Sequence, residues 1–280
     1  MLVFGTVGLV VRGTAFPSAF IAMARGFIGS AIIISAILLM KRHPDVTAIK
    51  KNIWLLLLSG TFIGINWILL FEAYKYTTVA NATLCYYMAP IFVVVLSPFV
   101  IGERIGMKKW CCVIAALVGM IFVSEPWADN GGGNGPLGIL LAIGAAIFYA
   151  GVTLLNKKMN DIGSYDTTLV QLLTAATVIA PYTFITEQIR ADMFTVQSIF
   201  LLLLLGVLHT GIAYVMFFGS VQKLPADMVA IFGYIDPITA VLLSALLLGE
   251  PMSAFGWLGA TLIILSTLIS SLTKPNNKTN

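Results

Sequence analysis

Charged residues are what this chain has least of. Only 10% of its 280 residues are Asp, Glu, Lys or Arg, whereas 59% are apolar. A soluble domain carries about 25% charged residues. The apolar residues form long runs instead of amphipathic stripes, so most of the apolar surface must face lipid. The composition therefore predicts an integral membrane protein, and the net charge of +4 offers no patch for nucleic acid.

Cysteines and catalytic motifs are also scarce. The three cysteines, Cys85, Cys111 and Cys112, lie in apolar runs, without metal-ligand spacing or an even disulfide framework. The sequence has no nucleotide-binding glycine loop, no cluster of metal-ligating residues and no nucleophile–base pair. We therefore expect no enzyme, no metal and no cofactor.

An internal repeat is the most informative feature that is present. At a fixed offset of 147, twelve positions between residues 64 and 110 recur without a gap between residues 211 and 257. The twelve are Gly64, Ile65, Phe71, Tyr87, Pro90, Ile91, Val94, Leu96, Ser97, Gly102, Glu103 and Trp110. An internal repeat in a very apolar chain is typical of secondary transporters, which open one binding site to two sides of a membrane in turn.

Nine apolar runs are long enough to cross a membrane as helices, which takes ~20 residues. They cover about residues 17–40, 52–74, 78–101, 107–124, 136–156, 165–186, 197–221, 226–248 and 254–272. Residues 1–11 form a tenth run of half that length, yet the five runs of the second half require five in the first. We predict an all-α membrane protein of ten transmembrane helices, built as two inverted five-helix repeats, with a short or truncated first helix.

The predicted domains follow from these runs. Residues 1–125 form the first repeat and residues 136–273 the second, joined by a Gly-rich linker at 126–135 and followed by a polar tail at 274–280. Lys and Arg are enriched in cytoplasmic loops. Twelve of them fall on the side of the two termini and three on the other side, which predicts cytoplasmic termini and an extracytoplasmic linker in the cytoplasmic membrane.

Several stretches carry a family resemblance. In the first half they are 71–84, 89–92, 102–104 and the span that contains Trp110, and in the second half 206–214, 236–238, 249–251 and the last span. Arg25, in Ala-Met-Ala-Arg, and the dipeptide Phe4-Gly5 add to them. The chain resembles the EamA-type, ten-helix members of the drug/metabolite transporter superfamily. The resemblance implies a helix bundle with a central cavity that exports or exchanges small metabolites.

The function expected from these features is transport of amino acids or related zwitterions by alternating access, more in the direction of export. The expected partners are a small-molecule substrate, the lipid bilayer and protons. Two alternatives stay open: a transporter of organic cations or drugs, and a membrane channel or scaffold protein.

Two charged residues inside the spans are candidate substrate ligands, because an ionisable group in a membrane is costly unless it faces a partner or a cavity. Arg25 suits a bidentate contact with a carboxylate. Asp236, directly before Pro237, suits an amine or a proton. The alternatives are structural: Arg25 locks neighbouring helices, and Asp236 caps backbone groups that Pro237 leaves free. Glu72 is expected simply to pair with Lys75.

His209 lies midway along the eighth span, and an ordinary histidine pKa of about 6.5 suits proton coupling. We therefore expect coupling through His209 and Asp236, with a helix–helix hydrogen bond as the alternative role of His209. Five aromatic residues inside spans are candidates for an aromatic wall around the substrate, with ordinary packing as the alternative: Trp67, Tyr87, Tyr149, Tyr214 and Tyr234.

Overall fold

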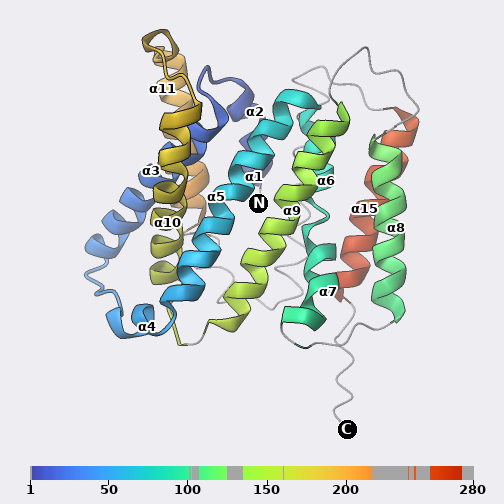
Figure 1. Cartoon of the computed structure of the whole chain (residues 1–280), viewed down its shortest axis with the longest axis horizontal. Helices are drawn as coiled ribbons and strands as arrows, with labels where there is room; N and C mark the ends of the chain where they lie inside the picture. The colour runs from blue at the N-terminus through green and yellow to red at the C-terminus, as the bar shows by residue number, and fades with distance from the viewer. Residues whose placement is uncertain are drawn as a thin grey trace.

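The computed structural model describes residues 2–100, 102, 107–124, 135–159, 161–214, 216, 239, 243 and 253–272, and no strand occurs among them. The helices run side by side as a bundle (Figure 1). Their bounds are α1 Leu2–Gly5, α2 Val7–Arg12, α3 Ser18–Leu39, α4 Val46–Lys51, α5 Ile53–Tyr76, α6 Val79–Tyr86, α7 Ala89–Val100, α8 Met107–Ser124, α9 Gly135–Lys158, α10 Ser164–Thr186, η1 Ala191–Met193, α11 Val196–Leu203, η2 Leu204–Ile212 and α15 Ala254–Leu272.

Four of these helices, α3, α5, α9 and α10, are long and apolar enough to cross a membrane. Shorter apolar helices cover four more of the predicted spans, and the predicted span 226–248 lies outside the described residues, apart from Thr239 and Leu243. Large apolar side chains such as Leu140, Phe184 and Ile185 are exposed on the outer faces. Lipid rather than water suits such a surface.

Three predicted spans are not single α-helices. The run at 78–101 is split into α6 and α7 because Pro90 has no N–H to bond the carbonyl of Tyr86. The run at 1–11 is split at Thr6, whose hydroxyl oxygen lies 2.8 Å from the carbonyl oxygen of Val3. The run that begins near residue 197 starts as α11 and continues from Leu204 as the π-helix η2.

The helices α3 and α10 form an antiparallel pair at one side of the bundle (Figure 1). α10 also packs along α5, α3 along η2, α5 along α9, and α8 along α15. Glycines allow the close approach: a Cβ on Gly26 would come within 2.9 Å of the Cβ of Ala176 in α10. A Cβ on Gly211 of η2 would come within 2.5 Å of Ile32 in α3. Small residues at such contacts let helices associate in lipid, where no hydrophobic force drives them together.

Both ends of the α3–α10 pair are tied by polar contacts. At one end, the buried carboxylate of Asp166 accepts from Arg42 at 3.5 Å and from the backbone N–H of Asp45 at 3.4 Å. At the other end, the carboxylate of Glu187 accepts from the backbone N–H of Ala19 at 3.5 Å. In each case the chain that follows one helix holds the start of the other.

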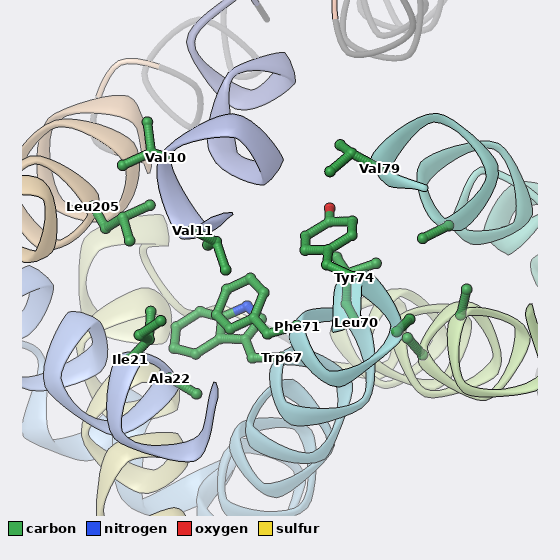
Figure 2. Close-up of a cluster of buried hydrophobic side chains, with 14 of the residues drawn as sticks. Val10, Val11, Ile21, Ala22, Trp67, Leu70, Phe71, Tyr74, Val79 and Leu205 are labelled. Atoms are coloured by element: carbon green, nitrogen blue, oxygen red, sulfur yellow. The ribbon is translucent and has the colours of Figure 1, made fainter. Parts of the chain in front are cut away.

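The buried apolar cluster lies where α2, α3, α5 and η2 meet. Figure 2 shows Val11 of α2 and Ala22 of α3 turned toward the rings of Trp67 and Phe71, with Leu205 of η2 at one side. This cluster surrounds the position of Arg25, so the one charged side chain of α3 is placed among apolar groups.

Gly211→Ala tests the close contact between η2 and α3. We expect the variant to melt at a lower temperature than the wild-type protein in detergent, because overpacking costs about 1–3 kcal/mol, more than the ~1 kcal/mol that Ala gains in helix propensity. Gly135→Ala is the matched control, since nothing lies within 4 Å of a Cβ there. Adding Ile32→Ala should restore part of the loss. Equal melting of the two single variants would rule out the contact.

Candidate functional site

Arg25 is buried in α3, with 4% of its surface exposed. Its guanidinium carbon lies 4.3 Å from the centre of the Trp67 ring and 5.4 Å from that of Phe71. Both rings belong to α5, one turn apart, and lie together in the apolar cluster (Figure 2). A cation–π contact at a desolvated site is worth about 2 kcal/mol, which offsets part of the cost of burying the charge.

One hydrogen bond orients this guanidinium. Nε donates to the hydroxyl of Thr210 at 3.0 Å, and that hydroxyl donates to the carbonyl of Leu205 at 2.9 Å. Among the described residues, the terminal nitrogens of Arg25 have no hydrogen-bond partner and no carboxylate. Among the described side chains, the polar atoms that are fully enclosed and lack a hydrogen-bond partner belong to Thr83 and Asp166. The terminal nitrogens of Arg25 lack a partner but are not fully enclosed, so they keep some accessible surface. The free edge of the guanidinium therefore suits a carboxylate bound in bidentate fashion.

His209 is the second buried ionisable group of the site, at 1% exposure. Its Nε2 lies 2.7 Å from the Thr6 hydroxyl oxygen, and its Nδ1 lies 3.1 Å from the carbonyl oxygen of Leu204. A carbonyl only accepts, so Nδ1 carries the hydrogen of that bond. The contact with Thr6 joins η2 to the first turns of the chain, which is the bond that the structural alternative expects. A role in proton coupling stays a prediction.

The π-helical turn places these groups side by side. The contacts of His209 and Thr210 with the carbonyls of Leu204 and Leu205 each reach back five residues. Consecutive side chains of η2 thus face two different elements: His209 contacts Thr6, between α1 and α2, and Thr210 contacts Arg25 in α3. π-Helical turns are rare and occur frequently at functional sites.

The predicted aromatic residues that the structure describes lie in two groups, one at Arg25 and one at Tyr86. Trp67 stacks on Arg25, and Tyr214 is close enough to the guanidinium to interact electrostatically. Tyr86 contacts both Tyr87 and Tyr149, with ring centres 5.9 and 5.6 Å apart, in a cluster of α6, α9 and the residue after α6. Tyr149 is 42% exposed. Two predicted site residues, Tyr234 and Asp236, lie outside the described residues.

Five residues that interact with Arg25 or His209 were missed by the sequence reasoning. Thr210, Phe71 and Thr6 make the contacts described above, and Tyr86 and Tyr74 interact electrostatically with Arg25. The signal available for Thr210 is weak: a hydroxyl next to a mid-span histidine, between Gly206 and Gly211. Glu72, by contrast, pairs with Lys75 at 2.7 Å as predicted.

Comparison with known proteins decides the family. The model of the EamA-like transporter family matches residues 1–125 and 136–272. The chain belongs to the EamA-like transporter family. As predicted from the residues, it is thus a relative of the drug/metabolite transporters, and this EamA-like protein is a multi-pass membrane transporter of a small molecule.

Relatives of this EamA-like protein cover most of its length. An uncharacterized transporter, YxxF, of Bacillus subtilis is 27% identical over 94% of this chain and 84% of its own. Protein RarD of Salmonella typhi is 28% identical over 80% of this chain and 76% of its own. A riboflavin transporter of Vibrio cholerae is 29% identical over 64% of this chain and 57% of its own. A protein of known crystal structure shares the fold, with a TM-score of 0.68 at 20% identity over 96% of this chain and 93% of its own.

Thr210→Val in this EamA-like protein tests how firmly Arg25 is held. The variant removes the acceptor of Nε inside an apolar core, and leaving a buried charged donor unpaired costs roughly 1.5–3 kcal/mol. We expect a lower unfolding midpoint in detergent for Thr210→Val and a near wild-type midpoint for Thr210→Ser, which keeps the hydroxyl. If both variants unfold at the wild-type midpoint, the Nε bond does not hold Arg25.

Proposed function

We propose that this transporter carries amino acids or related zwitterions across the cytoplasmic membrane, by alternating access and more in the direction of export. The observation that supports this is the state of Arg25: a buried guanidinium with a free edge and no carboxylate partner among the described residues. A substrate carboxylate supplies the missing partner. The flanking rings of Trp67 and Phe71 suit an apolar side chain next to it.

The same cation weighs against the first alternative, a carrier of organic cations. Two like charges repel each other several times more strongly in a low-dielectric surrounding than in water. An organic cation bound beside Arg25 would need a strong counter-charge at that place, and no carboxylate pairs with Arg25 among the described residues. In the proposal, Asp236 binds the substrate ammonium and Tyr87, Tyr149, Tyr214 and Tyr234 line its path.

Alternating access rests on two inverted repeats, and one pair of contacts supports them. Gly64 of α5 lies against Ile179 of α10, where a Cβ would come within 2.9 Å. Gly211 of η2 lies against Ile32 of α3. At the offset of 147, Gly64 becomes Gly211 and Ile32 becomes Ile179, so each contact turns into the other. Such an exchange of contacts is expected when two copies of one fold face each other through their second helices.

Helix bounds support the same proposal. α3 and α10 begin 146 residues apart (164 − 18) and end 147 apart (186 − 39). α8 and α15 begin 147 apart (254 − 107) and end 148 apart (272 − 124). We therefore propose residues 1–125 and 136–273 as the two five-helix repeats, joined at 126–135. Nearly all of that linker, and the proposed tail at 274–280, lie outside the described residues.

Counterflow in proteoliposomes, with a panel of labelled amino acids, amines and sugars, tests the proposed substrate class. We expect saturable, trans-stimulated exchange of at least one amino acid, since the binding site of a carrier can return across the membrane with a second substrate molecule bound. Arg25→Gln should lower its affinity roughly 10- to 150-fold, the equivalent of the ~1.5–3 kcal/mol of a charged hydrogen bond. Arg190→Gln is the control, because Arg190 pairs with Asp192 on the exposed surface. Linear, unsaturable flux would point to the channel alternative.

A cysteine at position 134 tests the proposed orientation. Both termini are proposed to be cytoplasmic, because twelve basic residues lie on their side and three on the other. An impermeant thiol reagent applied to intact cells should then label Asn134→Cys, in a background where Cys111, the exposed native cysteine, is replaced by Ser. Labelling that appears only after permeabilisation would reverse the orientation.

A further inference from the structure

The site holds two buried groups that can carry positive charge next to each other. Arg25 contacts Thr210, and His209 is the neighbour of Thr210 in η2. Arg25 and His209 are close enough to interact electrostatically. With Arg25 charged and unpaired, a second positive charge on His209 is unfavourable, because like charges repel strongly in an apolar surrounding.

No other charge near His209 changes this balance within the part of the chain that the structure describes. The elements packed against η2 are α1, α2, α3 and α11, and their only charged residues are Arg12 and Arg25. Arg12 donates instead to the carbonyls of Tyr74 and Thr77 at the end of α5. The phenol of Tyr214, which follows η2, is the remaining titratable group.

The surroundings of His209 accept either protonation state without moving the backbone. In the neutral form, Nδ1 donates to Leu204 and Nε2 accepts from the hydroxyl of Thr6. When Nε2 gains a proton it becomes the donor, and the Thr6 hydroxyl turns to donate to the carbonyl of Val3, 2.8 Å away. One rotation of a hydroxyl therefore keeps every hydrogen bond of His209 satisfied in both states.

We propose that the substrate carboxylate and a proton bind together, the carboxylate on Arg25 and the proton on Nε2 of His209. The proposal rests on the function proposed above, since it needs a carboxylate on Arg25. That carboxylate neutralises the guanidinium and removes a repulsion that disfavours a positive charge on His209. The loaded site then holds two positive charges and one carboxylate, and the empty site holds one positive charge, so one proton enters with each substrate.

Co-binding makes the protein a proton–substrate cotransporter. Proton and substrate move in the same direction, so export proceeds when the outward substrate gradient exceeds the inward proton gradient. Binding is also reciprocal: if the substrate promotes protonation of His209, protonation of His209 promotes substrate binding by the same factor.

Substrate affinity measured against pH tests this linkage. The probes are the twenty standard L-amino acids, each ¹⁴C-labelled and measured alone with the full-length protein in detergent, from about pH 5.5 to 8, on both sides of the ordinary histidine pKa of ~6.5. For each amino acid that binds, we expect the affinity to rise as the pH falls, by up to about tenfold per pH unit, the limit for one linked proton. In His209→Gln the affinity should become independent of pH while binding persists.

The outcomes separate the two proposals. Binding whose affinity does not change with pH in the wild-type protein would overturn co-binding and leave the proposed function standing. A pH dependence that persists unchanged in His209→Gln would also overturn it, because another group would then hold the proton. If none of the amino acids binds at any pH, the proposed function fails, and co-binding fails with it. Thr6→Ser, which keeps the hydroxyl, should retain the wild-type pH profile.

Discussion

The site depends on the burial of one guanidinium that has no counter-ion among the described residues. Burying an unpaired charge is costly, and Arg25 is stabilised only in part, by the faces of Trp67 and Phe71 and by one hydrogen bond to Thr210. A salt bridge would have completed the stabilisation and closed the site. In the proposed function, this incomplete set leaves the free edge of the guanidinium for the substrate carboxylate.

The π-helical turn of η2 is the backbone feature that lets Thr210 contact Arg25 while His209 contacts Thr6. In an α-helix, a backbone N–H bonds the carbonyl four residues back, whereas in a π-helix such as η2 it bonds the carbonyl five residues back. The side chains of His209 and Thr210 bond carbonyls that also lie five residues back. Close packing fixes the wider turn in place: Gly206 lies against Ile28 and Gly211 against Ile32, so α3 holds η2 on either side of the two polar residues. The close packing of these glycines therefore also fixes the positions of His209 and Thr210.

The sequence predicted the helices well and their internal breaks poorly. The length of an apolar run is a direct property of sequence, so the predicted run 165–186 nearly coincides with α10. The break at Tyr87 follows from Pro90, a signal that was present but not used. Arg25, Trp67 and His209 were predicted as site residues because polar or aromatic residues inside a span stand out, and their roles stay a prediction. The contact between Thr6 and His209, 203 residues apart, depends on packing, which no local pattern encodes.

The proposed repeat is symmetric in its scaffold and asymmetric in its chemistry. At the offset of 147, the glycine–isoleucine contacts are exchanged, but Arg25 corresponds to Leu172 and His209 to Phe62. In the proposed function, the two end states depend on backbone packing, whereas a small substrate occupies one place at a time and needs only one guanidinium for its carboxylate. A second buried guanidinium in place of Leu172, which packs close to Gly26 and Gly29, would add its desolvation cost and repel the first. In the proposals, the two copies therefore contribute different charged groups: Arg25 comes from the first copy, and His209 and Asp236 come from the second.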